Sequence, residues 1–117
     1  MRNSRKIYYN IHTLQSLIFY EWMNGLIDYW SSQLNKLKLL QKIFNSQKNV
    51  RFDDFVLILE MFDFECDRIS GSHRIYKRSG IPELINIQNV NGTAKPYQIK
   101  QFFYLIEKYD LKTKEEA

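Results

Sequence analysis

Three short segments with strand character follow one another in the second half of the chain, and they limit the folds that it can adopt. They cover residues 64–70, 72–78 and 84–90. The turn sequences Ser70-Gly71-Ser72 and Ser79-Gly80-Ile81-Pro82 separate them. Because short glycine turns join neighbouring antiparallel strands, this spacing predicts an antiparallel meander of three strands.

Helical patterns flank these strands on both sides. The first helix is expected to begin with Asp53 or Asp54 as its cap, and the last to begin near Pro96 and end near Tyr109. In the first helix, apolar residues recur at the i, i+3, i+4, i+7 spacing of a buried helix face: Phe55, Ile58, Leu59 and Phe62. Two such helices can cover one face of the sheet and leave the other open. We therefore expect an α+β fold, an α-β-β-β-α two-layer sandwich like that of double-stranded-RNA-binding domains.

The N-terminal part of the chain predicts additional helix. Apolar residues recur at helical spacing before residue 33, and Gly25 and the pair Ser31-Ser32 are candidate breaks. Residues 35–46 form a further amphipathic pattern that ends in a polar loop. The expected organisation is a helical extension of unknown role over residues 1–33, a domain over 34–112 and a charged, frayed tail over 113–117.

Length and composition exclude several classes of protein. A chain of 117 residues holds one ordinary domain with an extension. The single cysteine, Cys66, cannot form an internal disulfide, so we expect a reducing, cytoplasmic location and a buried Cys66. No membrane association is expected, because polar residues interrupt the most apolar stretch, residues 7–30, well before the roughly 20 apolar residues that a spanning helix needs.

Positive charge is concentrated in one part of the predicted domain. The net charge is +4, yet between residues 68 and 100 six basic residues accompany one acidic residue, Glu83. Clustered charge of this kind favours binding of a polyanion. The acidic residues Asp63, Glu65 and Asp67 precede the cluster and would repel phosphate beside them.

His73 follows the glycine turn within this basic cluster. A histidine in a strand is most often structural, and His12 has no neighbours that suggest more. The basic surroundings of His73 instead favour proton transfer at a phosphodiester. Strand alternation leaves two arrangements open. Either His73 shares an open face with Lys77 while Tyr76 packs inward, or a bulge after Gly71 brings Arg74 to the histidine.

Three sequence blocks, at residues 50–55, 67–76 and 92–102, resemble the HicA toxin family. They read Val-Arg-Phe-Asp-Asp-Phe, Asp-Arg-Ile-Ser-Gly-Ser-His-Arg-Ile-Tyr and Gly-Thr-Ala-Lys-Pro-Tyr-Gln-Ile-Lys-Gln-Phe, within a resemblance that covers about residues 37–111. The resemblance implies a metal-independent mRNA interferase of a type II toxin–antitoxin system, with His73 as its catalytic residue. It implies a HicB-like antitoxin as protein partner and mRNA as substrate, and no metal or organic cofactor. Residues 1–33 have no counterpart in this resemblance.

The residues expected to bind RNA lie around the glycine turn and at the start of the last helix. They are Gly71, Ser72, Arg74, Lys77, Arg78, Lys95 and Lys100. Tyr97 is expected to pack rather than to stack on a base. The alternative reading is a noncatalytic RNA-binding or antitoxin-binding module of the same fold, a decayed toxin, which has no need of the histidine.

Overall fold

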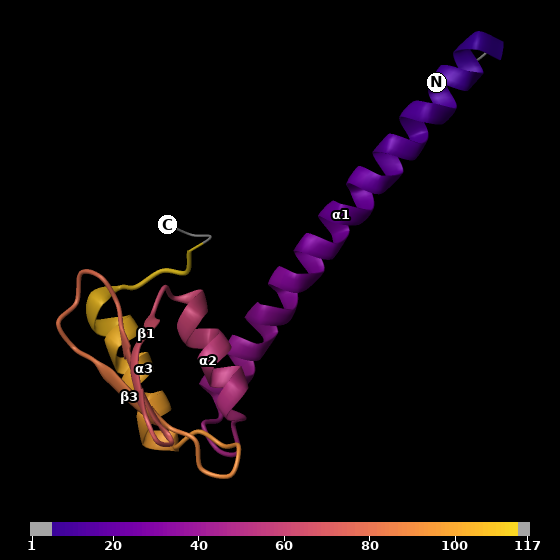
Figure 1. The fold of residues 1–117 in the computed structure, drawn as a ribbon. Helices are drawn as coiled ribbons and strands as arrows, with labels where there is room; N and C mark the ends of the chain where they lie inside the picture. The colour runs from indigo at the N-terminus through magenta and orange to yellow at the C-terminus, as the bar shows by residue number, and fades with distance from the viewer. Residues whose placement is uncertain (1–5, 115–117) are drawn as a thin grey trace. The chain divides into compact units, whose positions relative to one another are not determined.

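The computed structural model describes the backbone of residues 6–114 and the side chains of residues 19–114 (Figure 1). The chain divides into two compact units, one that ends at Leu37 and one that begins at Lys38. The elements in chain order are α1 (Lys6–Asn45), α2 (Phe52–Met61), β1 (Glu65–Ser70), β2 (His73–Lys77), β3 (Ile85–Gln88) and α3 (Pro96–Tyr109).

The described part of the first unit, from Lys6 to Leu37, consists of α1 alone. α1 continues through Gly25 and through Ser31 and Ser32, so the predicted breaks at these positions are wrong. The physical reason is that glycine costs a helix interior only about 1 kcal/mol relative to alanine and serine costs less, while neither removes a backbone hydrogen bond as proline does.

The second unit is built on a three-stranded sheet in the order β1-β2-β3, and both strand pairs are antiparallel. This confirms the predicted meander. β1 contains an irregularity in register between Cys66 and Arg68. Apolar residues from one face of this sheet and from both α2 and α3 form one buried cluster, which confirms the α+β class with two helices against the sheet.

Phe102 of α3 lies at the centre of the core. Its ring is fully buried. Four other phenylalanine rings pack edge-on around it at centroid distances of 5.2 to 5.9 Å: Phe55, Phe62, Phe64 and Phe103. The helical stripe identified in the sequence is therefore the core face of α2, with Phe55, Ile58 and Leu59 inaccessible to solvent.

The start of α2 is set by a contact with a loop from later in the chain. α2 begins at Phe52 with Arg51 as its N-cap, so the predicted capping by Asp53 or Asp54 is wrong. The backbone N–H of Phe52 donates to the carbonyl of Gly92 at 2.8 Å, and this bond fixes the start of the helix ahead of the aspartates. Asp53 and Asp54 lie in the first turn instead, where carboxylates interact favourably with the helix dipole.

The end of the domain is held in place through Lys114. The side chain of Thr113 is buried, and the backbone N–H of Lys114 donates to the carbonyl of Met61 at 3.1 Å. The expectation of a frayed tail is therefore wrong for these two residues, while residues 115–117 lie outside the described part. Within residues 6–114, no helix combines the length and the apolar character that crossing a membrane requires.

Candidate functional site

His73 lies on the open face of the sheet. Tyr76 is 2% exposed and belongs to the core cluster. Because side chains alternate along a strand, His73, Ile75 and Lys77 point away from that core. The register irregularity lies in β1, not after Gly71. The structure thus shows the first of the two arrangements that the sequence left open.

Asn86 of β3 holds the His73 imidazole. The His73 Nδ1 atom lies 3.2 Å from Asn86 Oδ1. With the amide oxygen as acceptor, the imidazole donates from Nδ1, and in the neutral ring this tautomer has its lone pair on Nε2. The arrangement favours the tautomer in which the histidine can act as a base at Nε2.

Gln88 supports the same face of the sheet. It pairs with His73 across the strands, and its Nε2 lies 3.4 Å from Ser72 Oγ. Its backbone N–H donates to Oε1 of the buried Gln98 at 2.9 Å, which ties β3 to α3. Neither Asn86 nor Gln88 is among the site residues predicted from the sequence, although their alternation with the buried Ile85 and Ile87 marks them as open-face residues.

The cations of the open face are paired with a carboxylate. Asp67 lies 3.3 Å from Lys77 Nζ and 2.7 Å from Arg68 Nη1. Hydrogen bonding from Lys77, with a further bond from Arg68, lowers the pKa of Asp67 below its ordinary value. The acidic edge expected on the first strand therefore neutralises part of the positive charge on this face. Arg78 also has an internal partner, because its Nε donates to the Phe62 carbonyl at 2.7 Å.

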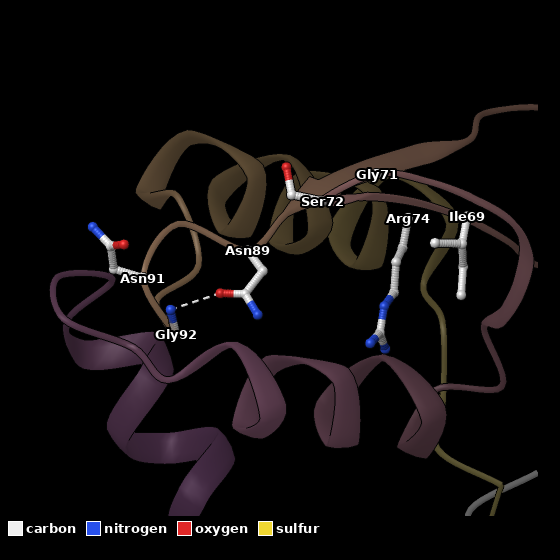
Figure 2. A pocket seen from close by; sticks show the side chains of 7 residues that line it. All are labelled: Ile69, Gly71, Ser72, Arg74, Asn89, Asn91 and Gly92. Carbon is white, nitrogen blue, oxygen red and sulfur yellow. Dashed lines mark hydrogen bonds between the residues drawn. The ribbon is translucent and has the colours of Figure 1, made fainter.

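Arg74 points to the opposite side of the sheet and lines a hollow of about 400 Å³. Figure 2 shows its side chain extending toward α2, whereas the Ser72 hydroxyl points the other way. Its guanidinium lies 5.1 Å from the centre of the Phe52 ring. Burial raises the pKa of the adjacent Tyr76 hydroxyl, and Arg74 opposes that rise. The hollow is lined by Ile69, Gly71, Ser72, Arg74, Asn89, Asn91 and Gly92.

The hollow presents several polar groups to a ligand. Arg74 forms no ion pair with a carboxylate within residues 19–114. Asn89 Oδ1 accepts a bond of 2.7 Å from the Gly92 N–H, which orients the rest of its amide (Figure 2). A guanidinium and oriented amides are groups that bind phosphate oxygens or base edges. The turn at Gly71 thus brings Gly71, Ser72 and Arg74 to the hollow and places His73 on the other face.

Lys95 and Lys100 lie at the start of α3. Neither forms an ion pair with another described side chain, and Lys100 is exposed. Lys95 Nζ lies 5.9 Å from the centre of the Tyr97 ring. Tyr97 is 63% exposed, so the expectation that it packs is wrong. It lies on the outer face of α3, because Ile99 and Phe102 occupy the face that meets the core.

Cys66 is exposed, and the expectation of a buried thiol is wrong. β1 is an edge strand with all six residues exposed, so Cys66 is accessible to solvent although its partner across the strands, Tyr76, is buried. Its Sγ lies 3.6 Å from the carbonyl of Arg68. Within residues 19–114, no three His, Cys, Asp or Glu side chains are grouped as a metal site would require.

The domain is an α+β fold in which two helices back an antiparallel sheet. A hydrogen-bonded histidine lies on the open face of the sheet, and a hollow with a basic side chain lies at the adjacent turn. These two features form a candidate site for a phosphodiester ligand. Residues 52–109 match the model of a family described as the HicA toxin of bacterial toxin–antitoxin systems. Through this domain the chain belongs to the HicA toxin family, as the sequence resemblance predicted. No curated protein and no solved structure matched the chain.

Proposed function

We propose that the protein is an endoribonuclease toxin that cleaves mRNA and that His73 is its catalytic residue. The observation that carries this proposal is the His73–Asn86 contact of 3.2 Å on the open face of a HicA-family domain. A fixed imidazole with a free Nε2 suits proton transfer near neutral pH. It follows the Gly71-Ser72 turn, whose residues line the polar hollow on the other face of the sheet.

The proposed reaction uses the RNA's own 2′-hydroxyl and no metal ion. His73 Nε2 accepts the proton of that hydroxyl, whose oxygen then attacks the adjacent phosphorus. The bond to the 5′ oxygen of the next nucleotide breaks, and this oxygen takes a proton from solvent. The products are a 2′,3′-cyclic phosphate and a 5′-hydroxyl end.

RNA binding in this proposal centres on the end of the β1–β2 hairpin. Gly71, Ser72 and Arg74 contact the nucleotide that enters the hollow, while Lys95 and Lys100 bind phosphates near the start of α3. Lys77 and Arg78 contribute less, because Asp67 and the Phe62 carbonyl already engage them. Sequence alone offers no reason to expect different contributions to RNA binding from these seven residues, whereas the existing partners of Lys77 and Arg78 do.

A HicB-like antitoxin is the proposed protein partner. It would inhibit the toxin by covering the open face and the imidazole of His73. Acidic side chains on the antitoxin would compete with RNA for Arg74, Lys95 and Lys100, which lack carboxylate partners among the described side chains. The cytoplasm is the proposed site of action, since it contains both mRNA and the reducing conditions that suit a lone exposed cysteine.

The test is induced expression of the wild type, His73→Ala and His12→Ala in a bacterial host, with growth and mRNA integrity followed together. His12→Ala is the matched control because it removes the chain's other histidine. Growth arrest with loss of mRNA is expected for the wild type and His12→Ala, and neither effect for His73→Ala at equal expression. Toxicity that survives His73→Ala would refute the proposal. RNA binding without cleavage by the wild type would instead establish the noncatalytic module.

A further inference from the structure

The first unit exposes a long row of large apolar side chains. Each is at least half exposed, from 50% for Tyr29 to 63% for Tyr20. They all belong to α1 between residues 19 and 37: Phe19, Tyr20, Trp22, Ile27, Tyr29, Trp30, Leu34 and Leu37. Soluble proteins rarely leave so large a continuous apolar surface uncovered, and such surfaces commonly mark an interface.

The spacing of this face follows the heptad repeat of a coiled coil. Alternating steps of four and three residues connect Phe19, Met23, Leu26, Trp30, Gln33 and Leu37. Five of these six positions are apolar, and a single polar residue within such a seam typically sets register. The opposite side of the helix is polar, with Glu21, Asn24, Asp28, Ser31, Ser32 and Asn35.

This part of α1 needs a partner in order to be stable. Glu21 and Asp28 are the only charged residues between positions 19 and 35, so no ion pairs of opposite charge support the helix surface. The segment also contains Gly25 and five aromatic residues, all weaker helix formers than alanine. Isolated helices of this length are marginal even with favourable sequences, and burial of an apolar face is what normally stabilises them.

The exposed area matches one side of a stable dimer. An aromatic side chain carries roughly 150–250 Å² of surface, so the eight half-exposed residues offer on the order of 800 Å² to a partner. One partner of a standard protein interface contributes about 800 Å². A second copy of the same helix therefore offers an area that matches the exposed row.

Other occupants fit this face less well. The exposed apolar side chains of the second unit are spread over several separate segments and form no comparable row: Phe44, Leu57, Ile69, Leu84, Val90, Tyr97 and Tyr104. Helices that lie on lipid surfaces carry lysine and arginine on their polar side, whereas residues 19–35 contain neither. The two acidic residues of this stretch also disfavour a nucleic acid.

We propose that the face of α1 formed by Phe19, Met23, Leu26, Trp30 and Leu37 is a self-association surface that pairs two copies of the chain. Identical helices supply the same seam with the same spacing, as the self-complementary interface of a two-fold dimer requires. The proposal is independent of the ribonuclease function, because none of its residues belongs to the candidate site.

The test compares sedimentation velocity of the full-length chain and two variants over a wide range of concentrations. Trp30→Glu puts a charge on the seam, and Ser31→Glu puts the same charge one residue away on the polar side. All proteins carry His73→Ala so that toxicity does not limit their production. Circular dichroism checks that the second unit remains folded. Trp22 and Trp30 are the only tryptophans of the chain, so their fluorescence reports on this face alone.

The parent and Ser31→Glu are expected to sediment as dimers, with tryptophan emission that shifts to the blue as concentration rises. Trp30→Glu is expected to sediment as a monomer. If Trp30→Glu loses helix, the conservative Trp30→Leu is expected to retain the dimer. A parent that stays monomeric at every concentration would overturn the proposal, as would equal dimerisation of both glutamate variants. Monomers that bind neutral lipid vesicles through the tryptophans would assign the face to lipid instead.

Discussion

Replacing Phe102 by alanine should remove a large part of the stability of the domain. Phe102 is 0% exposed, and four phenylalanine rings contact it edge-on. Truncation of a buried phenylalanine costs about 3–5 kcal/mol, and the lost edge contacts favour the upper half of that range. The free energy of unfolding of small domains is only about 5–15 kcal/mol. If the wild-type domain lies at the lower end of that range, the variant should be close to unfolding.

The assay is urea unfolding of the full-length chain followed by circular dichroism, because both tryptophans lie in α1 and do not report on this core. Tyr104→Ala is the matched control: it removes an aromatic ring that is 62% exposed from the same helix, and it should change the unfolding free energy by no more than about 0.5 kcal/mol. Phe102→Leu should be less destabilising than Phe102→Ala and keep the fold measurable. A loss below about 1 kcal/mol for Phe102→Ala, or an equal loss for Tyr104→Ala, would refute this account of the core.

Three further predictions concern the site and the charge pairs. Asn86→Ala removes a hydrogen bond of His73 worth about 0.5–1.5 kcal/mol, so RNA cleavage should slow roughly 2- to 12-fold with unchanged RNA affinity; unchanged cleavage would show that Asn86 does not position the imidazole. Lys100→Ala should weaken RNA binding and flatten its dependence on salt, as measured by titration at several ionic strengths; an unchanged slope would place Lys100 outside the interface. Hydrogen bonding from Lys108 lowers the pKa of Glu83 below its usual 4.5, so the stability from this pair is present above that pH and is lost as pH falls through the lowered pKa. Melting temperatures of Glu83→Gln should therefore fall less steeply on acidification than those of the wild type, and parallel curves would contradict this.

Sequence patterns predicted the elements of the domain well because each pattern had a local physical cause. The glycine turns at Gly71 and Gly80 occur at left-handed φ values of 61° and 91°, where residues with a side chain are strained. Those turns fix where the strands end. Pro96 begins α3 as expected, since its missing N–H costs nothing in a first helical turn.

The features that sequence could not predict depend on contacts between distant residues. The start of α2 is set by the carbonyl of Gly92, forty residues further along the chain from Phe52. The exposure of Cys66 follows from the position of β1 at the edge of the sheet. The pairing of Asp67 with Lys77 likewise depends on two strands lying side by side. None of these relations leaves a signal in the local pattern.

The site could be predicted in part for the same reason. The position of His73 beside a glycine turn is a local feature, and alternation limited it to two arrangements. Its partner Asn86 lies on another strand, so the pairing of the two residues required the register of β2 with β3. Alternation with the buried Ile85 and Ile87 is by itself enough to place Asn86 on the open face.

The separation of His73 and Arg74 onto opposite faces of β2 has a consequence for the proposed cleavage of RNA. The open face carries the imidazole, but its cations Arg68 and Lys77 are already paired with Asp67. The hollow on the other side carries a guanidinium with no carboxylate partner among the described residues. Electrostatic attraction for phosphate is thus strongest on one side of the hairpin, and proton transfer is available on the other. An RNA strand that uses both must pass around the turn at Gly71, so loss of Arg74 should weaken binding while loss of His73 should stop turnover with binding retained.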